Sequence, residues 1–274
     1  MDFASRILQI AEETVTANPK VETGDVASAL VVYYRALDPE NQPGFREAVV
    51  NLLDETEMDS CLLQELFWLC NRLELDEAAP RLMEMLRNAE SASAMDTVPV
   101  GLSRAGVQRA AALLTLIVIR GFASPPASMA AHLVHHQCLG ALARGCPIAV
   151  VPFLRPLFED NMKRGFKSWQ AGPESYRYGG AQLPSLVAKV LREYGVDGVE
   201  LVKDTFTGIP TQWEAYLRAA LEEALRILGD PHYGELVAPP LLSDIAGTLN
   251  NYMGLLGSTT EYITPATPPW PEDK

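Results

Sequence analysis

The sequence predicts an all-α protein of about twelve short helices, packed as stacked antiparallel hairpins or as an irregular helical array. Apolar residues recur three and four positions apart through almost every window, as they do on one face of a helix. No segment shows the sustained alternation that is typical of a strand. The expected helices cover residues 3–18, 26–37, 44–55, 59–75, 76–90, 103–122, 126–144, 147–170, 183–194, 197–207, 211–229 and 239–256.

Helix-start residues and turn-forming residues set the expected boundaries. Asp2 is placed to cap the first helix, and Asp25 is placed to cap the second. Residues 91–102, SASAMDTVPVGL, are rich in small and turn-forming residues and are expected to form a loop. The tail over 258–274 is rich in Pro and Thr and should not continue a helix. We therefore expect one helical domain over 1–257, with sub-lobes at 1–90 and 102–257.

The most apolar run is Ala110–Ile119, which lies between Arg109 and Arg120. It has about half of the ~20 residues that are needed to cross a bilayer. This run is therefore predicted to be a buried helix, and no membrane partner is expected.

One stretch of the chain resembles another. Residues 60–88 align without a gap on residues 132–160, so that Pro80 falls on Pro152 and Leu82 on Leu154. Residues 182–208 form a third, weaker copy. A single helical hairpin cannot bury both of its faces, but stacked hairpins cover one another. This alignment predicts four core leucines: Leu66, Leu82, Leu154 and Leu157.

The second helix of the two stronger copies begins Ala79-Pro80-Arg81-Leu82 in one and Val151-Pro152-Phe153-Leu154 in the other. This string is similar to that of the HEAT and armadillo-like helical repeats. The resemblance implies a scaffold or a binding surface and no particular partner. A non-repeating helical bundle is the alternative.

Charge is distributed unevenly along the chain. The net charge is −13 overall, with −12 in residues 1–100, +6 in residues 101–170 and −7 in residues 171–274. The overall acidity argues against general nucleic-acid binding. The basic segment 101–170 leaves open the alternative of a nucleic-acid-associated accessory factor.

The ends and the cysteines favour a cytoplasmic protein. The first residues lack the basic and apolar regions of a signal peptide. The four cysteines show no CxxC spacing and are expected to be small core residues in a reducing compartment; they are Cys61, Cys70, Cys138 and Cys146.

Cations and aromatic side chains alternate in residues 161–180. Such a mixture suits a protein interface, where Arg, Trp and Tyr are common anchors. It also suits phosphates with stacked bases, or a helix end that is followed by gap-filling aromatic residues. We predict a binding surface for an acidic protein partner, made of Lys163, Arg164, Lys167, Trp169, Tyr176, Arg177 and Tyr178.

The stretch HLVHHQC holds the weak candidates for a metal site. His132 and His136 are four residues apart and share a helix face, whereas His135 falls on a core position of the alignment. A zinc site needs about three or four ligands, and no matching pair occurs elsewhere. We therefore expect no metal, with His132 and His136 exposed and His135 buried.

No catalytic motif was found. The nucleophile-elbow pattern GxSxG and the phosphate-binding loops are absent. We therefore expect no cofactor and no catalysis, and predict an adaptor that binds another protein. A helical enzyme whose site is assembled from distant residues is a further alternative.

Overall fold

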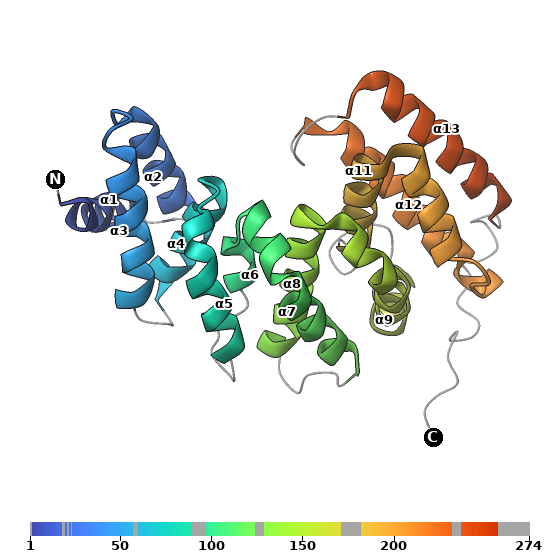
Figure 1. The fold of residues 1–274 in the computed structure, drawn as a ribbon. Coiled ribbons are helices and arrows are strands. Elements are labelled where there is room, and N and C mark those ends of the chain that lie inside the picture. The colour runs from blue at the N-terminus through green and yellow to red at the C-terminus, as the bar shows by residue number, and fades with distance from the viewer. Residues whose placement is uncertain are drawn as a thin grey trace. The chain divides into compact units, whose positions relative to one another are not determined.

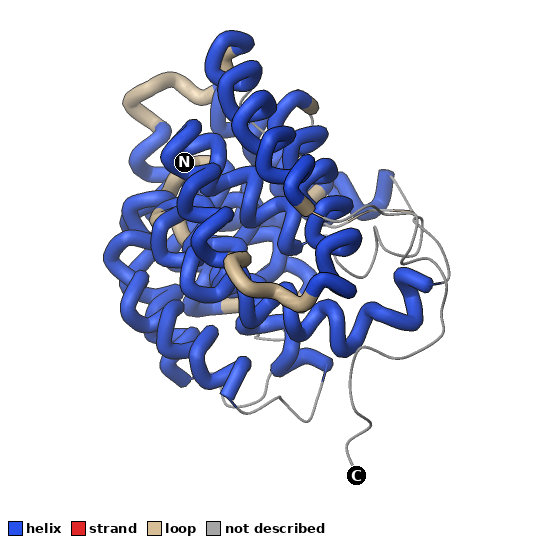
Figure 2. The backbone as a smooth tube through the Cα atoms, turned by 90° about the vertical axis from the view of Figure 1, so that its right-hand side faces the viewer, coloured by secondary structure: helices blue, strands red, loops and turns tan. Residues whose placement is uncertain are grey.

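The computed structural model describes residues 2–17, 20, 22, 24–56, 60–88, 97–123, 129–170, 182–231 and 237–256. Within its helices, the side chains of residues 88, 129–134, 161–170 and 182 lie outside the described part. The described residues form twelve α-helices and three short 3-10 helices, and none of them forms a strand (Figure 2). The all-α class is therefore confirmed.

The chain divides into two compact units, which meet in the sequence at Cys146 and Pro147. The first unit contains α1 Phe3–Ala17, α2 Asp25–Ala36, α3 Gln42–Glu55, α4 Cys61–Arg72, η1 Asp76–Ala78, α5 Ala79–Asn88, α6 Val98–Gly101, α7 Arg104–Ala123 and α8 Met129–Gly145 (Figure 1). The second contains η3 Pro147–Val150, α9 Val151–Gln170, α11 Gln182–Thr205, η4 Thr211–Trp213, α12 Glu214–Gly229 and α13 Pro239–Leu255.

Helices of the first unit pack mostly on near neighbours in the chain. The α1 helix packs on α2 and α3, and α2 packs on α4. The α4 helix packs on α6, and α6 in turn contacts α5 and α8. The α7 and α8 helices form the most extensive pair. In the second unit, α11 is central and contacts α9, α12 and α13.

The twelve observed helices are not the twelve that were expected. The predicted loop 91–102 contains α6, whose residues are all buried. The two helices expected over 183–194 and 197–207 are both present within α11, and the backbone between them leaves helical geometry at Gly195. Gly195 has φ 57° and ψ −131°, a combination that only glycine adopts without strain. The predicted break between these two helices is therefore confirmed at Gly195.

The two aligned stretches have matching elements. A 3-10 turn ends at Ala78 in one and at Val150 in the other, and the next helix starts at Ala79 and at Val151. These positions differ by the same 72 residues as the alignment. The four leucines that the alignment placed in the core are all fully buried, which confirms that prediction.

The α7 helix contains the apolar run. Of the helices in the described part, it is the one that by length and composition could cross a membrane. Its inner face is buried at Val107, Ala110, Leu114 and Val118. On its outer face, Leu116 is 43% exposed and Ile119 is 49% exposed. The prediction of a buried helix therefore holds for one face only.

Two expectations about burial were wrong. Cys61 is exposed and Cys146 is half-buried, so only Cys70 and Cys138 are core residues. Cys61 is exposed because it lies at the first position of α4, outside the stripe that packs inward. His136 is buried, although its alignment with Gln64 predicted exposure. Its ring lies 4.2 Å from that of the buried His135, so both histidines pack inward.

Candidate functional site

A groove in the first unit is the strongest candidate for a binding site. Its volume is about 500 Å³. One wall comes from α1 and the other from the start of α4, with the start of α2 between them. The lining residues are Leu8, Ala11, Glu12, Val15, Thr16, Glu22, Val26, Cys61, Leu62, Gln64 and Glu65.

The groove exists because α1 and α4 both pack on α2 and hardly touch each other. The buried stripe of α1, at Phe3, Ile7 and Ile10, faces the unit's core. A second stripe on α1, Leu8–Ala11–Val15, faces the groove, since residues three and four apart share a helix face. The α1 helix is therefore apolar on a wider arc than its own packing requires.

Two large apolar side chains on the α1 wall of the groove are exposed to solvent. Leu8 is 44% exposed and Val15 is 54% exposed. Single exposed apolar residues are ordinary on protein surfaces, but here two of them share one concave surface. Val26 lines the groove as a buried residue from α2. These features give the groove the apolar character that is typical of a binding site.

Glu65 connects α4 to the start of α2 through hydrogen bonds. It is only 6% exposed, and its two carboxylate oxygens accept hydrogen bonds from the backbone N–H groups of Gly24 (2.6 Å) and Ala27 (2.9 Å). The predicted capping role of Asp25 is wrong. Asp25 is the first residue of α2 and instead accepts a bond from the Glu22 N–H. A side chain from another helix therefore caps α2.

Gly24 is needed at this junction. Its φ is 98°, in the left-handed region that favours glycine. A Cβ on this residue would lie 3.3 Å from Nη2 of Arg72. Arg72 also donates a hydrogen bond of 2.5 Å to Ser28 Oγ. The start of α2 is therefore held by two side chains of α4.

The chargeable groups that line the groove are acidic. They are Glu12, Glu22 and Glu65, and no Lys or Arg is among the described residues that line it. The charge of Glu65 is compensated by the two N–H groups at the positive end of the α2 dipole. Glu12 and Glu22 are exposed. The groove therefore combines apolar walls with two carboxylates open to solvent.

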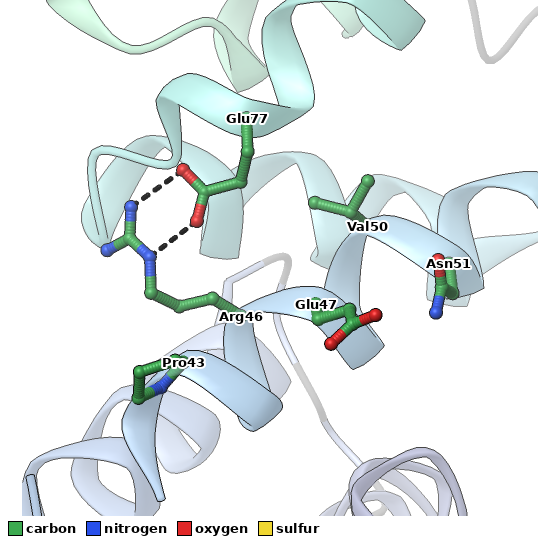
Figure 3. A pocket seen from close by; sticks show the side chains of 6 residues that line it. All are labelled: Pro43, Arg46, Glu47, Val50, Asn51 and Glu77. Atoms are coloured by element: carbon green, nitrogen blue, oxygen red, sulfur yellow. Dashed lines mark hydrogen bonds and ion pairs between the residues drawn. The ribbon is translucent and has the colours of Figure 1, made fainter. Parts of the chain in front are cut away.

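A second hollow of about 350 Å³ lies beside α3 and is better explained as a structural clamp (Figure 3). In it, Nε and Nη2 of Arg46 lie 2.6 and 2.8 Å from the carboxylate oxygens of Glu77. Arg46 also donates to the carbonyls of Leu73 and Glu74, after the end of α4. The guanidinium of Arg46 lowers the pKa of Glu77, and the carboxylate raises that of Arg46. Since both side chains use their polar atoms on each other and on the backbone, this hollow offers little to a ligand.

The surface that the sequence predicted lies outside what the structure describes. Lys163, Arg164, Lys167 and Trp169 belong to α9, but their side chains are not among the described ones. Tyr176, Arg177 and Tyr178 are outside the described residues altogether. That surface stays a prediction.

The metal candidates are likewise not brought together in the described part. The side chain of His132 is outside it, and His136 is buried beside His135. Among the described residues, no group of three or more His, Cys, Asp or Glu is placed to hold a metal ion. The absence of a metal site stays a prediction.

The groove was not predicted from the sequence. A signal was present in the N-terminal helix, where Leu8, Ala11 and Val15 form a second apolar stripe beside the core stripe. The walls of α4 and α2 carry no comparable signal, because their places beside α1 depend on tertiary packing. Comparisons with protein-family models, with curated proteins and with solved structures found no match.

Proposed function

We propose that this chain is a non-catalytic binding protein that receives an amphipathic helix of a partner protein in the groove between α1 and α4. The observation that carries the proposal is the open apolar wall formed by Leu8, Ala11 and Val15. A partner that covers this wall removes apolar surface from water, which is the main driving force of association.

The helical walls favour a helix as the occupant. In strand addition, an extended peptide gains affinity by pairing its backbone with a free sheet edge. Helix backbones use their N–H and C=O groups internally, so α1 and α4 offer no such edge. A partner helix instead places side chains at i, i+3, i+4 and i+7 into a groove, and packs about 8–10 Å from its neighbours.

The rest of the chain supports a scaffold role. The matched boundaries at Ala79 and Val151 and the matched core leucines are consistent with repeated helical hairpins of the HEAT-like kind. Hairpins of this kind provide extended surfaces for partners rather than catalytic sites. The cationic and aromatic residues near the end of α9 remain a proposed second surface, for an acidic protein.

The test uses a synthetic 14-residue amphipathic peptide with Leu on one face and Gln on the other. Binding is measured by titration calorimetry to the full chain and to a Leu8→Gln/Val15→Gln variant. Both residues are exposed, so the variant should stay folded. Val32→Gln is the matched control, because Val32 is 69% exposed on α2 and does not line the groove.

We expect the peptide to bind the wild type and the Val32→Gln control, and to lose most of its affinity for the double variant. Equal affinity for all three proteins, or no binding to any of them, would contradict the proposed function.

A further inference from the structure

We infer that the partner helix carries Lys or Arg beside its apolar stripe, so that the groove selects a cationic amphipathic helix. This inference rests on the proposed function and adds the charge of the partner. It follows from the positions of Glu12 and Glu22 and from what the docking of a helix would do to them.

Glu12 lies within the surface that an occupant must cover. It stands four residues after Leu8 and three before Val15, so the three side chains share one face of α1. A helix that covers both apolar residues therefore covers the carboxylate between them. Removing a charge from water without a partner is unfavourable.

The described part of the chain supplies no counter-ion to these two carboxylates. Within the described residues, the carboxylates of Glu12 and Glu22 take part in no hydrogen bond or ion pair. Some other acidic residues of the unit are paired: Glu13 lies 3.7 Å from Arg6, and Asp54 lies 2.6 Å from Arg81. Glu65, the third carboxylate of the groove, is already bound to backbone N–H groups.

The occupant must therefore bring the positive charge. A cation opposite Glu12 or Glu22 would compensate the carboxylate, whereas an acidic flank would face two like charges. The surrounding segment strengthens this preference, because residues 1–100 carry a net charge of −12.

Cys61 offers a way to localise binding. It lines the groove and is exposed, so an occupant should shield its thiol from an alkylating reagent. Among the remaining cysteines, Cys70 and Cys138 are buried, and the half-buried Cys146 can be changed to Ser. The Cys61 alkylation rate then reports whether a probe is in the groove.

The experiment compares three 14-residue peptides that have the same Leu stripe and Lys, Gln or Glu flanks. Affinity is measured at 0.1 M and 1 M salt, together with protection of Cys61. The variant Glu12→Lys/Glu22→Lys reverses the charge of the groove. The control is Glu40→Lys with a second exposed substitution, Glu55→Lys, which makes the same change in net charge away from the groove.

We expect the Lys-flanked peptide to bind about tenfold more tightly than the Glu-flanked one. The Lys flanks form two attractive surface pairs with Glu12 and Glu22, whereas the Glu flanks form two repulsive ones. The preference should shrink at 1 M salt and reverse in the Glu12→Lys/Glu22→Lys variant, but not in the control. All bound peptides should protect Cys61.

Two results would separate the two proposals. Equal affinities with protection of Cys61 overturn the charge inference and leave the groove as a helix-binding site. No protection by any peptide overturns both, even if the Lys-flanked peptide binds elsewhere on this acidic chain. A wild-type dimer that is lost in the Leu8→Gln/Val15→Gln variant would identify a second copy as the occupant and also overturn the inference.

Discussion

Removing the carboxylate of Glu65 should destabilise the first unit strongly. The Glu65→Ala substitution leaves the N–H groups of Gly24 and Ala27 without acceptors in a buried place. An unsatisfied buried donor costs about 1–3 kcal/mol, and hydrogen bonds to a charged group are at the strong end of the range. We therefore expect a loss of about 3–5 kcal/mol in the free energy of unfolding, out of the ~5–15 kcal/mol that is typical of a domain.

Glu65→Gln is the more conservative change. Its single amide oxygen can accept one of the two bonds, and its NH₂ group would face the other N–H. We expect it to cost about 1–3 kcal/mol, less than Glu65→Ala. The control is Glu22→Ala, which removes an exposed carboxylate from the same groove.

Urea unfolding measures the global effect, and amide hydrogen exchange at Gly24 and Ala27 measures the local one. Both amides should exchange faster in the Glu65 variants than in the control, because the start of α2 would open more often. The capping role would be refuted if Glu65→Ala unfolds within about 0.5 kcal/mol of the wild type and the exchange of Ala27 does not change.

Three further predictions follow from single side chains. Iodoacetamide at pH 8 should modify Cys61 well before the buried Cys70 and Cys138, since burial raises the pKa of each of these two thiols to about 12. Mass spectrometry after partial labelling measures the order of modification, and equal rates at all three sites would contradict the prediction. Arg46 lowers the pKa of Glu77 below its ordinary value of 4.5, so their clamp stabilises the fold above that pH and weakens as the pH falls. The free energy of unfolding of wild type and of Glu77→Gln should differ by less than about 1 kcal/mol at pH 7, because the pair is partly exposed. Denaturation curves below pH 4.5 should show a smaller difference, and a larger one there would contradict the predicted pH dependence. Leu154→Ala should cost about 2–5 kcal/mol and lower the melting temperature clearly, whereas Glu84→Ala at an exposed position should not; equal small effects would contradict the helical phase.

The helical phase was predictable from the sequence because it depends on local spacing. Apolar residues three and four apart place Leu66 and Leu82 on inward faces whatever the neighbouring helices are. His136 is an exception, because it aligns with a polar residue and is nevertheless buried. A large aromatic ring can be buried where its neighbours leave space, and spacing alone does not show that space.

Short elements and caps were harder to predict. The α6 helix has only four residues, two of them Pro99 and Gly101, which usually indicate a loop. Its carbonyls have partners elsewhere: Asn71 donates to Val100 O at 2.6 Å, and Arg144 donates to the same oxygen at 3.2 Å. No local pattern reports a partner that lies more than 25 residues away.

The candidate groove could not be predicted either, because it too depends on contacts between residues that are distant in the sequence. The second apolar stripe of α1 could be read from the sequence, but it fits equally well a helix that is buried on two sides. Whether Leu8 and Val15 meet another helix depends on where α4 lies. That position depends on the packing of both helices on α2.

These side-chain caps bear on function as well as on stability. In the first unit, Glu65 caps the start of α2, Glu74 accepts from the Arg104 N–H at the start of α7, and Arg46 holds the carbonyls after α4. Each of these bonds joins elements that are well separated in sequence, so it fixes the relative position of two elements through directional contacts as well as apolar packing. The Glu65 contacts hold the α4 and α2 sides of the groove in this way, so these sides are formed before the partner arrives. The partner helix then does not need to order the walls, and a larger part of the energy from burying Leu8 and Val15 appears as affinity. Glu65→Gln should therefore weaken peptide binding in the groove although its side chain changes no apolar contact, and Glu77→Gln, beside the other hollow, should not.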